Sequence, residues 1–146
     1  MIFLAVFMAV LAPALERVAG APPPDMVLVQ TPADFFAWLR AGGETVRRLY
    51  GLFLVADTFY PVVYALFLGA WLWRLEPGSR LWQLPVWAAV ADYVENLTHA
   101  LLLYVYPAEP VWVAAVALVA TPVKWALITL TVLAILGRTW SSRTRA

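Results

Sequence analysis

The sequence of 146 residues contains no cysteine and a single histidine, His99. Without cysteine the chain can form no disulfide, thiolate nucleophile, iron–sulfur cluster or structural zinc site of the usual kind. One histidine also excludes a bis-histidine haem. Charge is scarce too, because charged residues make up 13% of the chain and ten basic residues balance nine acidic ones. No basic surface is available to neutralise a run of phosphates, so nucleic acid is not expected as a partner.

Apolar residues, by contrast, are abundant. They form 64% of the chain, and the mean hydropathy is +0.79. This composition is too apolar for a soluble globular domain. We therefore expect a single all-α integral membrane domain over 1–146, with the lipid bilayer as its surroundings.

Membrane spans are predicted from the long apolar runs. The hydrocarbon core requires about 20 apolar residues per helix, and this favours spans at about 49–73, 81–106 and 111–137. A fourth run at about 1–19 is shorter and resembles a signal peptide in length. No Lys or Arg precedes it, so we expect a retained first span. The expected fold is thus a bundle of four transmembrane helices joined by short links.

The loop after the first span has a different character. Its Pro-rich opening at 21–25 cannot be helical and is interpreted as an extended crossing on the surface. A short interfacial helix over about 32–41 should follow, since Thr31 can cap it, Pro32 suits its first position and Asp34 lies in its first turn. Its bulky apolar residues are expected to face the membrane interface.

Positive charges give a slight orientation bias. The side that would hold the N-terminus, the turn between the second and third spans, and the C-terminal tail carries five arginines, against four on the other side. The positive-inside rule then places both termini in the cytoplasm.

The informative residues are polar side chains inside the predicted spans, where each charge costs about 2.5–3.5 kcal/mol to insert. On the third span Asp92, Glu95, Asn96 and His99 follow the spacing i, i+3, i+4, i+7 and must share one helix face. The remaining members of this expected network lie on the second and fourth spans: Asp57, Tyr60, Tyr64 and Lys124.

This network has two interpretations. It can be structural, holding together helices that lack a hydrophobic driving force in lipid. It can also be functional, because three carboxylates facing one lysine imply that a carboxyl is protonated, or His99 charged, at neutral pH. The catalytic candidates are then Glu95, Asp92, His99 and Asp57.

Several chemistries lack their residues. No serine lies within a predicted span, which removes intramembrane Ser proteolysis and acyl transfer. A di-iron bundle needs Glu-x-x-His on two helices, and neither copy is present. Lys124 would repel a cation placed beside Glu95 and His99, so we expect neither a metal nor another cofactor.

One set of motifs is similar to a group of small, uncharacterised bacterial four-span membrane proteins. The motifs are Thr31-Pro32-Ala33-Asp34, Arg47-Arg48-Leu49-Tyr50, Asp57-x-x-Tyr60-Pro61-x-x-Tyr64, Asp92-x-x-Glu95-Asn96 and Thr121-x-x-Lys124. The resemblance implies the four-span architecture and the bacterial inner membrane, and it implies no activity. In kind alone, the chain also resembles the EXPERA-type fold, where a small helical bundle holds acidic residues around a sterol-like ligand; no motif matches there residue by residue.

The leading functional hypothesis is a non-catalytic protein, either an accessory subunit bound to other membrane subunits or a module that binds an apolar ligand. Small size favours it, because the bundle has little interior for a transport path. The alternatives are an intramembrane acid–base enzyme acting on a lipid-like substrate and a proton-coupled transporter.

Overall fold

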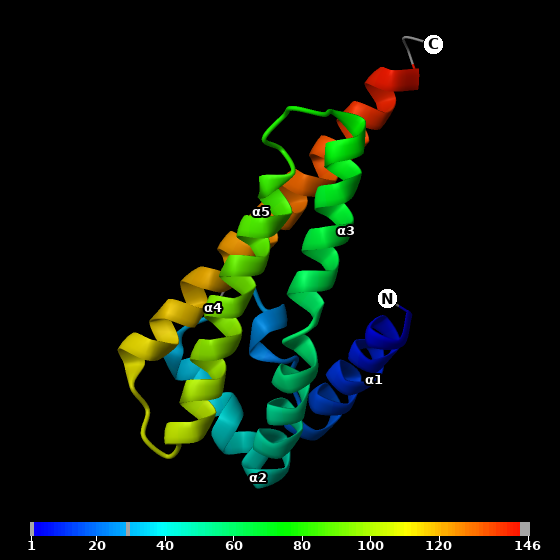
Figure 1. Cartoon of the computed structure of the whole chain (residues 1–146). Helices are drawn as coiled ribbons and strands as arrows, with labels where there is room; N and C mark the ends of the chain where they lie inside the picture. The colour runs from blue at the N-terminus through cyan, green and yellow to red at the C-terminus, as the bar shows by residue number, and fades with distance from the viewer. Residues whose placement is uncertain (1, 29, 144–146) are drawn as a thin grey trace.

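The computed structural model describes residues 2–28 and 30–143, and within them every regular element is helical (Figure 1). The all-α class expected from the sequence is therefore confirmed. The elements are α1 (Ile2–Ala19), the short 3-10 helix η1 (Pro24–Met26), α2 (Pro32–Asp57), α3 (Tyr60–Leu75), α4 (Gln83–Val105) and α5 (Val111–Arg143).

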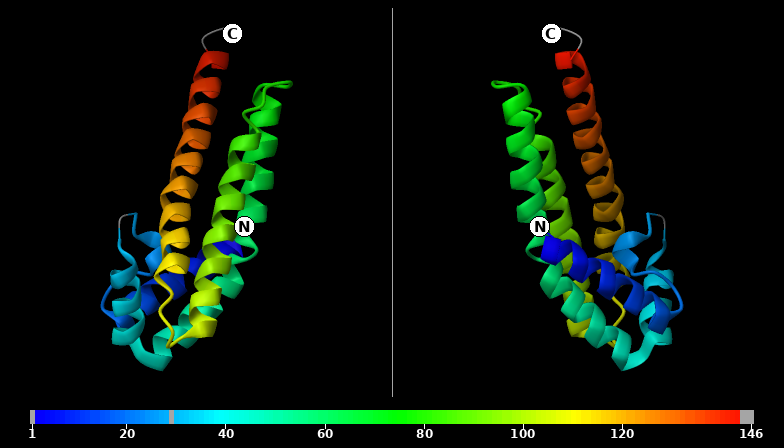
Figure 2. Two further views of the ribbon diagram at one scale, coloured as in Figure 1. Left: turned by 90° about the vertical axis from the view of Figure 1, so that its left-hand side faces the viewer. Right: turned by 90° about the vertical axis from the view of Figure 1, so that its right-hand side faces the viewer.

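The long helices α3, α4 and α5 run alongside one another, and α4 packs against both α3 and α5. Helices α1 and α2 gather with η1 at the end of the bundle opposite the C-terminus, and α1 lies at a steep angle to α5 (Figure 2). In the described part of the chain, two helical stretches are long and apolar enough to cross a membrane, Pro32–Leu75 and Val111–Ser141.

The predicted span 49–73 is divided between α2 and α3. The division falls at Thr58 and Phe59 because Pro61 has no N–H to donate to the carbonyl of Asp57. The Thr58 hydroxyl instead donates to the carbonyl of Leu54 at 2.9 Å, which closes the end of α2.

The N-terminus of α2 forms as its sequence predicts. The Thr31 side chain accepts from the backbone N–H of Asp34 at 3.3 Å, and the Asp34 carboxylate accepts from the Thr31 N–H at 2.7 Å. These two bonds form a capping box. Hydrogen bonds from the Thr31 hydroxyl and N–H also hold the pKa of Asp34 below its ordinary value.

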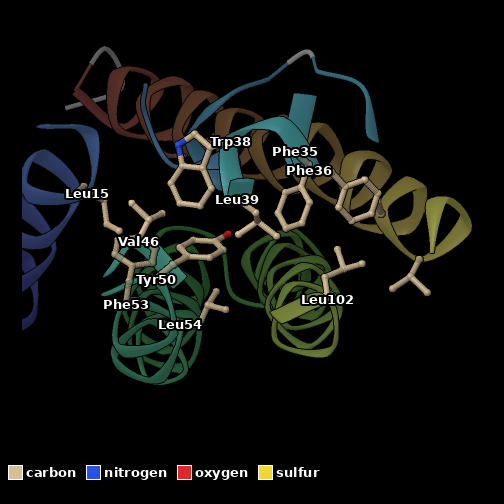
Figure 3. Packing of buried hydrophobic residues seen from close by; sticks show 13 residues of the cluster. Leu15, Phe35, Phe36, Trp38, Leu39, Val46, Tyr50, Phe53, Leu54 and Leu102 are labelled. Carbon is tan, nitrogen blue, oxygen red and sulfur yellow. The ribbon is translucent and has the colours of Figure 1, made fainter. Parts of the chain in front are cut away.

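The first part of α2 does not present its apolar side to a membrane interface, and this corrects the expectation for 32–41. Phe35, Phe36, Trp38 and Leu39 are buried in the largest apolar cluster of the protein (Figure 3). The reason is the bend at Gly43, which folds this part of α2 back onto the other helices. The cluster also takes in Leu15, Val46, Tyr50, Phe53, Leu54, Leu102 and Val113.

The Pro-rich segment is likewise not a surface crossing. Pro23, Pro24 and Asp25 are buried, and the chain turns there into η1. Burial is tolerated because prolines carry no N–H to satisfy and because side chains supply the missing donors. The indole of Trp38 donates to the carbonyl of Ala21 at 3.1 Å, and Gln30 donates to that of Pro24 at 2.7 Å.

We predict that the bend depends on Gly43, whose φ of 60° and ψ of −155° are accessible almost only to glycine. Gly43→Ala should lower the free energy of unfolding by about 1–3 kcal/mol, measured by thermal unfolding in mild detergent. The matched control is Gly51→Ala, in regular helix with open space at the Cβ position. It should be neutral or slightly stabilising; equal losses in both variants would contradict a special role for Gly43.

Candidate functional site

The polar face of α4 is turned inward. Asp92, Glu95, Asn96 and His99 are all at most 5% exposed. They meet side chains from α2, α3 and α5, so one face of one helix organises the polar interior. This buried charged network divides into three groups with different partners.

The first group is centred on Lys124 of α5. Its ammonium contacts Glu95 Oε2 and lies 3.3 Å from Asp92 Oδ1. The second oxygens of both carboxylates are also used, since Thr121 donates to Glu95 Oε1 and Tyr64 donates to Asp92 Oδ2 at 3.2 Å. Every carboxylate oxygen in this group has a donor, which is the condition for a buried ion pair to be tolerated.

The second group joins Asp57 at the end of α2 to Asn96. The amide of Asn96 donates to Asp57 Oδ2 at 2.7 Å. Among the described residues, no donor reaches Asp57 Oδ1 or the amide oxygen of Asn96. This group is only half satisfied, although both residues are buried.

The third group lies around His99 and was not foreseen as a unit. The Tyr50 hydroxyl lies 2.9 Å from His99 Nδ1 and 3.4 Å from Asp25 Oδ1. The His99 ring stacks on Phe35 with an interplanar angle of 4°. His99 Nε2 finds no partner in the described part of the protein. His99 therefore interacts with α2 and, through Tyr50, with η1, while Lys124 pairs with Asp92 and Glu95.

A cavity of about 260 Å³ adjoins these groups. Its polar wall consists of Asp25, Asp57, Asp92 and Lys124, which connects all three groups. Its remaining wall is formed by Met26, Tyr60, Trp125 and Ile128. Met26, Tyr60 and Trp125 are each more than a third exposed, so the cavity opens sideways between η1, α3 and α5.

Most of the residues singled out from the sequence are thus brought together. Tyr60 differs, because its hydroxyl has no hydrogen bond to the described residues and its ring packs on Tyr64 at the cavity mouth. Five residues that line or support the cavity were missed, namely Asp25, Met26, Tyr50, Trp125 and Ile128. The one available signal was an acid directly after a proline run.

Three of the four residues in the polar wall are carboxylates: Asp25, Asp57 and Asp92. This acidic wall allows proton exchange and cation binding. Within the described ranges, no three His, Asp or Glu side chains are arranged to hold a metal ion. We find no match to this chain among protein-family models, curated proteins or solved structures. The function of the site is therefore inferred from its geometry.

Proposed function

We propose that this chain is a four-span protein of the bacterial inner membrane that binds a membrane-dissolved ligand in the cavity beside the buried network. The proposed spans are α1, the part of α2 beyond the bend at Gly43 together with α3, then α4 and α5; α1, with 18 residues, is the shortest of them. At about 1.5 Å per residue, the 23 residues of α4 reach about 35 Å, enough for the hydrocarbon core. Large apolar side chains are exposed along α3, α4 and α5, as a lipid-facing surface requires.

The end that holds the C-terminus is proposed to face the cytoplasm. Three arginines lie in the last turn of α3, the α3–α4 turn and the last part of α5, which are at this end (Figure 1): Arg74, Arg80 and Arg138. Arg138 pairs there with Glu76 at 3.0 Å. This grouping agrees with the positive-inside rule.

The binding proposal is carried by a difference between the buried carboxylates in the number of their oxygens that accept a hydrogen bond. A network that served packing alone would be fully paired, as the Lys124 group is. Asp57 instead keeps one oxygen without a donor among the described residues, and it lines the cavity beside Asp25, whose carboxylate interacts with the Tyr50 hydroxyl and its own backbone N–H. The free oxygen of Asp57 is not among the fully buried atoms that lack a partner, so it reaches the cavity, where a bound ligand can donate to it.

A lateral opening supports a ligand that arrives from the bilayer. Met26 and Trp125 border the mouth and are about half exposed, at 47% and 40%. Such apolar rims with a few convergent polar groups are typical of small-molecule sites. This geometry favours the ligand-binding form of the hypothesis over the accessory-subunit form.

Acid–base catalysis on a lipid-like substrate is the second candidate, and one contact favours it. Tyr50 bridges His99 Nδ1 and Asp25, so a proton can pass between a cavity-lining carboxyl and a buried imidazole. In that case Asp25 would exchange the proton with the substrate. Glu95 is unsuited to this role because both its oxygens are occupied and it does not line the cavity.

The test is native mass spectrometry of the protein purified in mild detergent from its native membrane. We expect one small molecule per chain, retained in Leu133→Trp, whose position on α5 is 58% exposed. Ile128→Trp should lose the molecule because the larger ring fills the cavity. A defined complex with other subunits and no small molecule would overturn the proposal in favour of the accessory subunit, and release of a chemically altered product would favour the enzyme.

A further inference from the structure

We propose that the group bound at the acidic wall is an organic cation, the ammonium end of an amphiphile, held by Asp25 and Asp57 against the ring of Trp125. This inference rests on the proposed ligand-binding function and names the chemical class of the ligand. It follows from the charges, the aromatic wall and the size of the cavity.

The charges around the cavity do not balance. Lys124 is the one cationic side chain in the cavity wall; it pairs with Asp92 and Glu95, and its ammonium lies 5.7 Å from the centre of the Trp125 ring, which leaves the nearer side of that ring for a ligand. No cationic side chain of the described chain contacts Asp25 or Asp57, which are 5% and 4% exposed. A ligand that brings a positive charge and N–H donors would satisfy both carboxylates. The wall carries the carboxylates of Asp25, Asp57 and Asp92 against the one ammonium of Lys124, so a cation is attracted on balance although Lys124 repels it, and an anion is repelled.

The aromatic wall suits the same ligand. The Trp125 indole lies near the carbonyl of Asp25, with Nε1 and the oxygen 3.5 Å apart, which fixes the ring beside the acidic group. Tyr60 adds a second ring at the mouth. Faces of Trp and Tyr attract ammonium groups through their quadrupoles, and the interaction strengthens when the site is dry.

The size of the cavity argues for an organic group over a single ion. A volume of about 260 Å³ corresponds to about nine water molecules at roughly 30 Å³ each. A bare metal ion would fill a small part of it, and the described side chains provide no three-ligand set for one. An ammonium with a few carbon atoms fills the polar end, while Met26 and Ile128 leave an apolar exit for a chain.

The inference is tested with a matched pair of probes, hexylammonium, which carries N–H donors, and its uncharged carbon isostere heptane. Each is titrated calorimetrically into the purified protein in maltoside micelles, with empty micelles subtracted. We expect the cation to bind at least about ten-fold more tightly, the equivalent of about 1.4 kcal/mol. Hexanesulfonate, the anionic probe, should not bind.

Variants locate the binding. Asp57→Asn keeps the shape of the side chain and should weaken cation binding about ten-fold or more while leaving the isostere unaffected. Asp25→Asn should do the same. Trp125→Leu should weaken the cation several-fold and provides an independent readout if an Asn variant folds poorly. Glu44→Gln removes an exposed carboxylate that pairs with Arg48 on α2 and should change nothing.

The outcomes separate the two proposals. If the isostere binds as tightly as the cation, or Asp57→Asn and Trp125→Leu both keep full cation affinity, the cationic class is wrong and the binding function stands. If neither probe binds and no small molecule is retained during purification, the binding function fails together with this inference.

Discussion

Replacing Lys124 by Met is expected to lower the free energy of unfolding by about 3–5 kcal/mol, the usual cost of removing one partner from a buried ion pair. Methionine matches the apolar stem of lysine in length and lacks the ammonium, so the charge and its donors are removed. Asp92 and Glu95 would then face each other inside the protein without a cation, since Lys124 contacts both. Chemical unfolding in mild detergent, followed by tryptophan fluorescence, measures the loss.

Two further variants show whether the loss comes from uncompensated charge. Lys124→Met combined with Asp92→Asn and Glu95→Gln removes the charges together and should regain most of the lost stability. Arg48→Met breaks an exposed i, i+4 pair with Glu44 and should change stability by less than about 1 kcal/mol. If Lys124→Met is as stable as Arg48→Met, the buried pair does not stabilise the bundle.

The inward face of α4 is the feature that the sequence predicted best. The spacing of Asp92, Glu95, Asn96 and His99 is local, and helix geometry alone places such residues on one face. A charged side chain is costly in apolar surroundings. This cost favours turning the charged face of α4 toward the interior of the protein. The buried contact of Lys124 with Asp92 and Glu95 was likewise expected, because few other partners exist within the predicted spans.

The partners of His99 could not be predicted from the spacing of residues along one helix. His99 lies four positions after Glu95, which is about 6 Å along a helix. This difference in depth places His99 beside Tyr50 and away from Lys124. Tyr50 lies 49 positions away along the chain. The contact depends on how α2 bends and packs, and helix periodicity contains no information on that.

The cavity escaped prediction because its wall includes a loop. Asp25 follows a proline run, and local rules place such a run at the surface. In the structure, Trp38 of α2 donates to the carbonyl of Ala21, and Trp125 of α5 donates to the carbonyl of Asp25. Composition describes which groups a segment can satisfy by itself. It does not describe the donors that other helices bring.

Removal of the Tyr50 hydroxyl is the second change with a large expected effect, because this hydroxyl connects the buried side chains of His99 and Asp25. The side chain is fully buried, with its ring packed on Trp38 and Phe53. Tyr50→Phe keeps these ring contacts and removes one oxygen. His99 Nδ1 and Asp25 Oδ1 then both lose the Tyr50 hydroxyl as their hydrogen-bond partner.

We expect Tyr50→Phe to lower the free energy of unfolding by about 1–3 kcal/mol, because a buried polar group deprived of its partner costs this amount. The matched control is Tyr104→Phe, at a position on α4 that is 88% exposed, where the change should be negligible. Equal stability of the two variants would show that the Tyr50 hydroxyl is not bridging. If Tyr50→Phe is destabilised as expected and also binds the ammonium probe more weakly, then Tyr50 positions Asp25 for the ligand, because Tyr50 itself does not line the cavity.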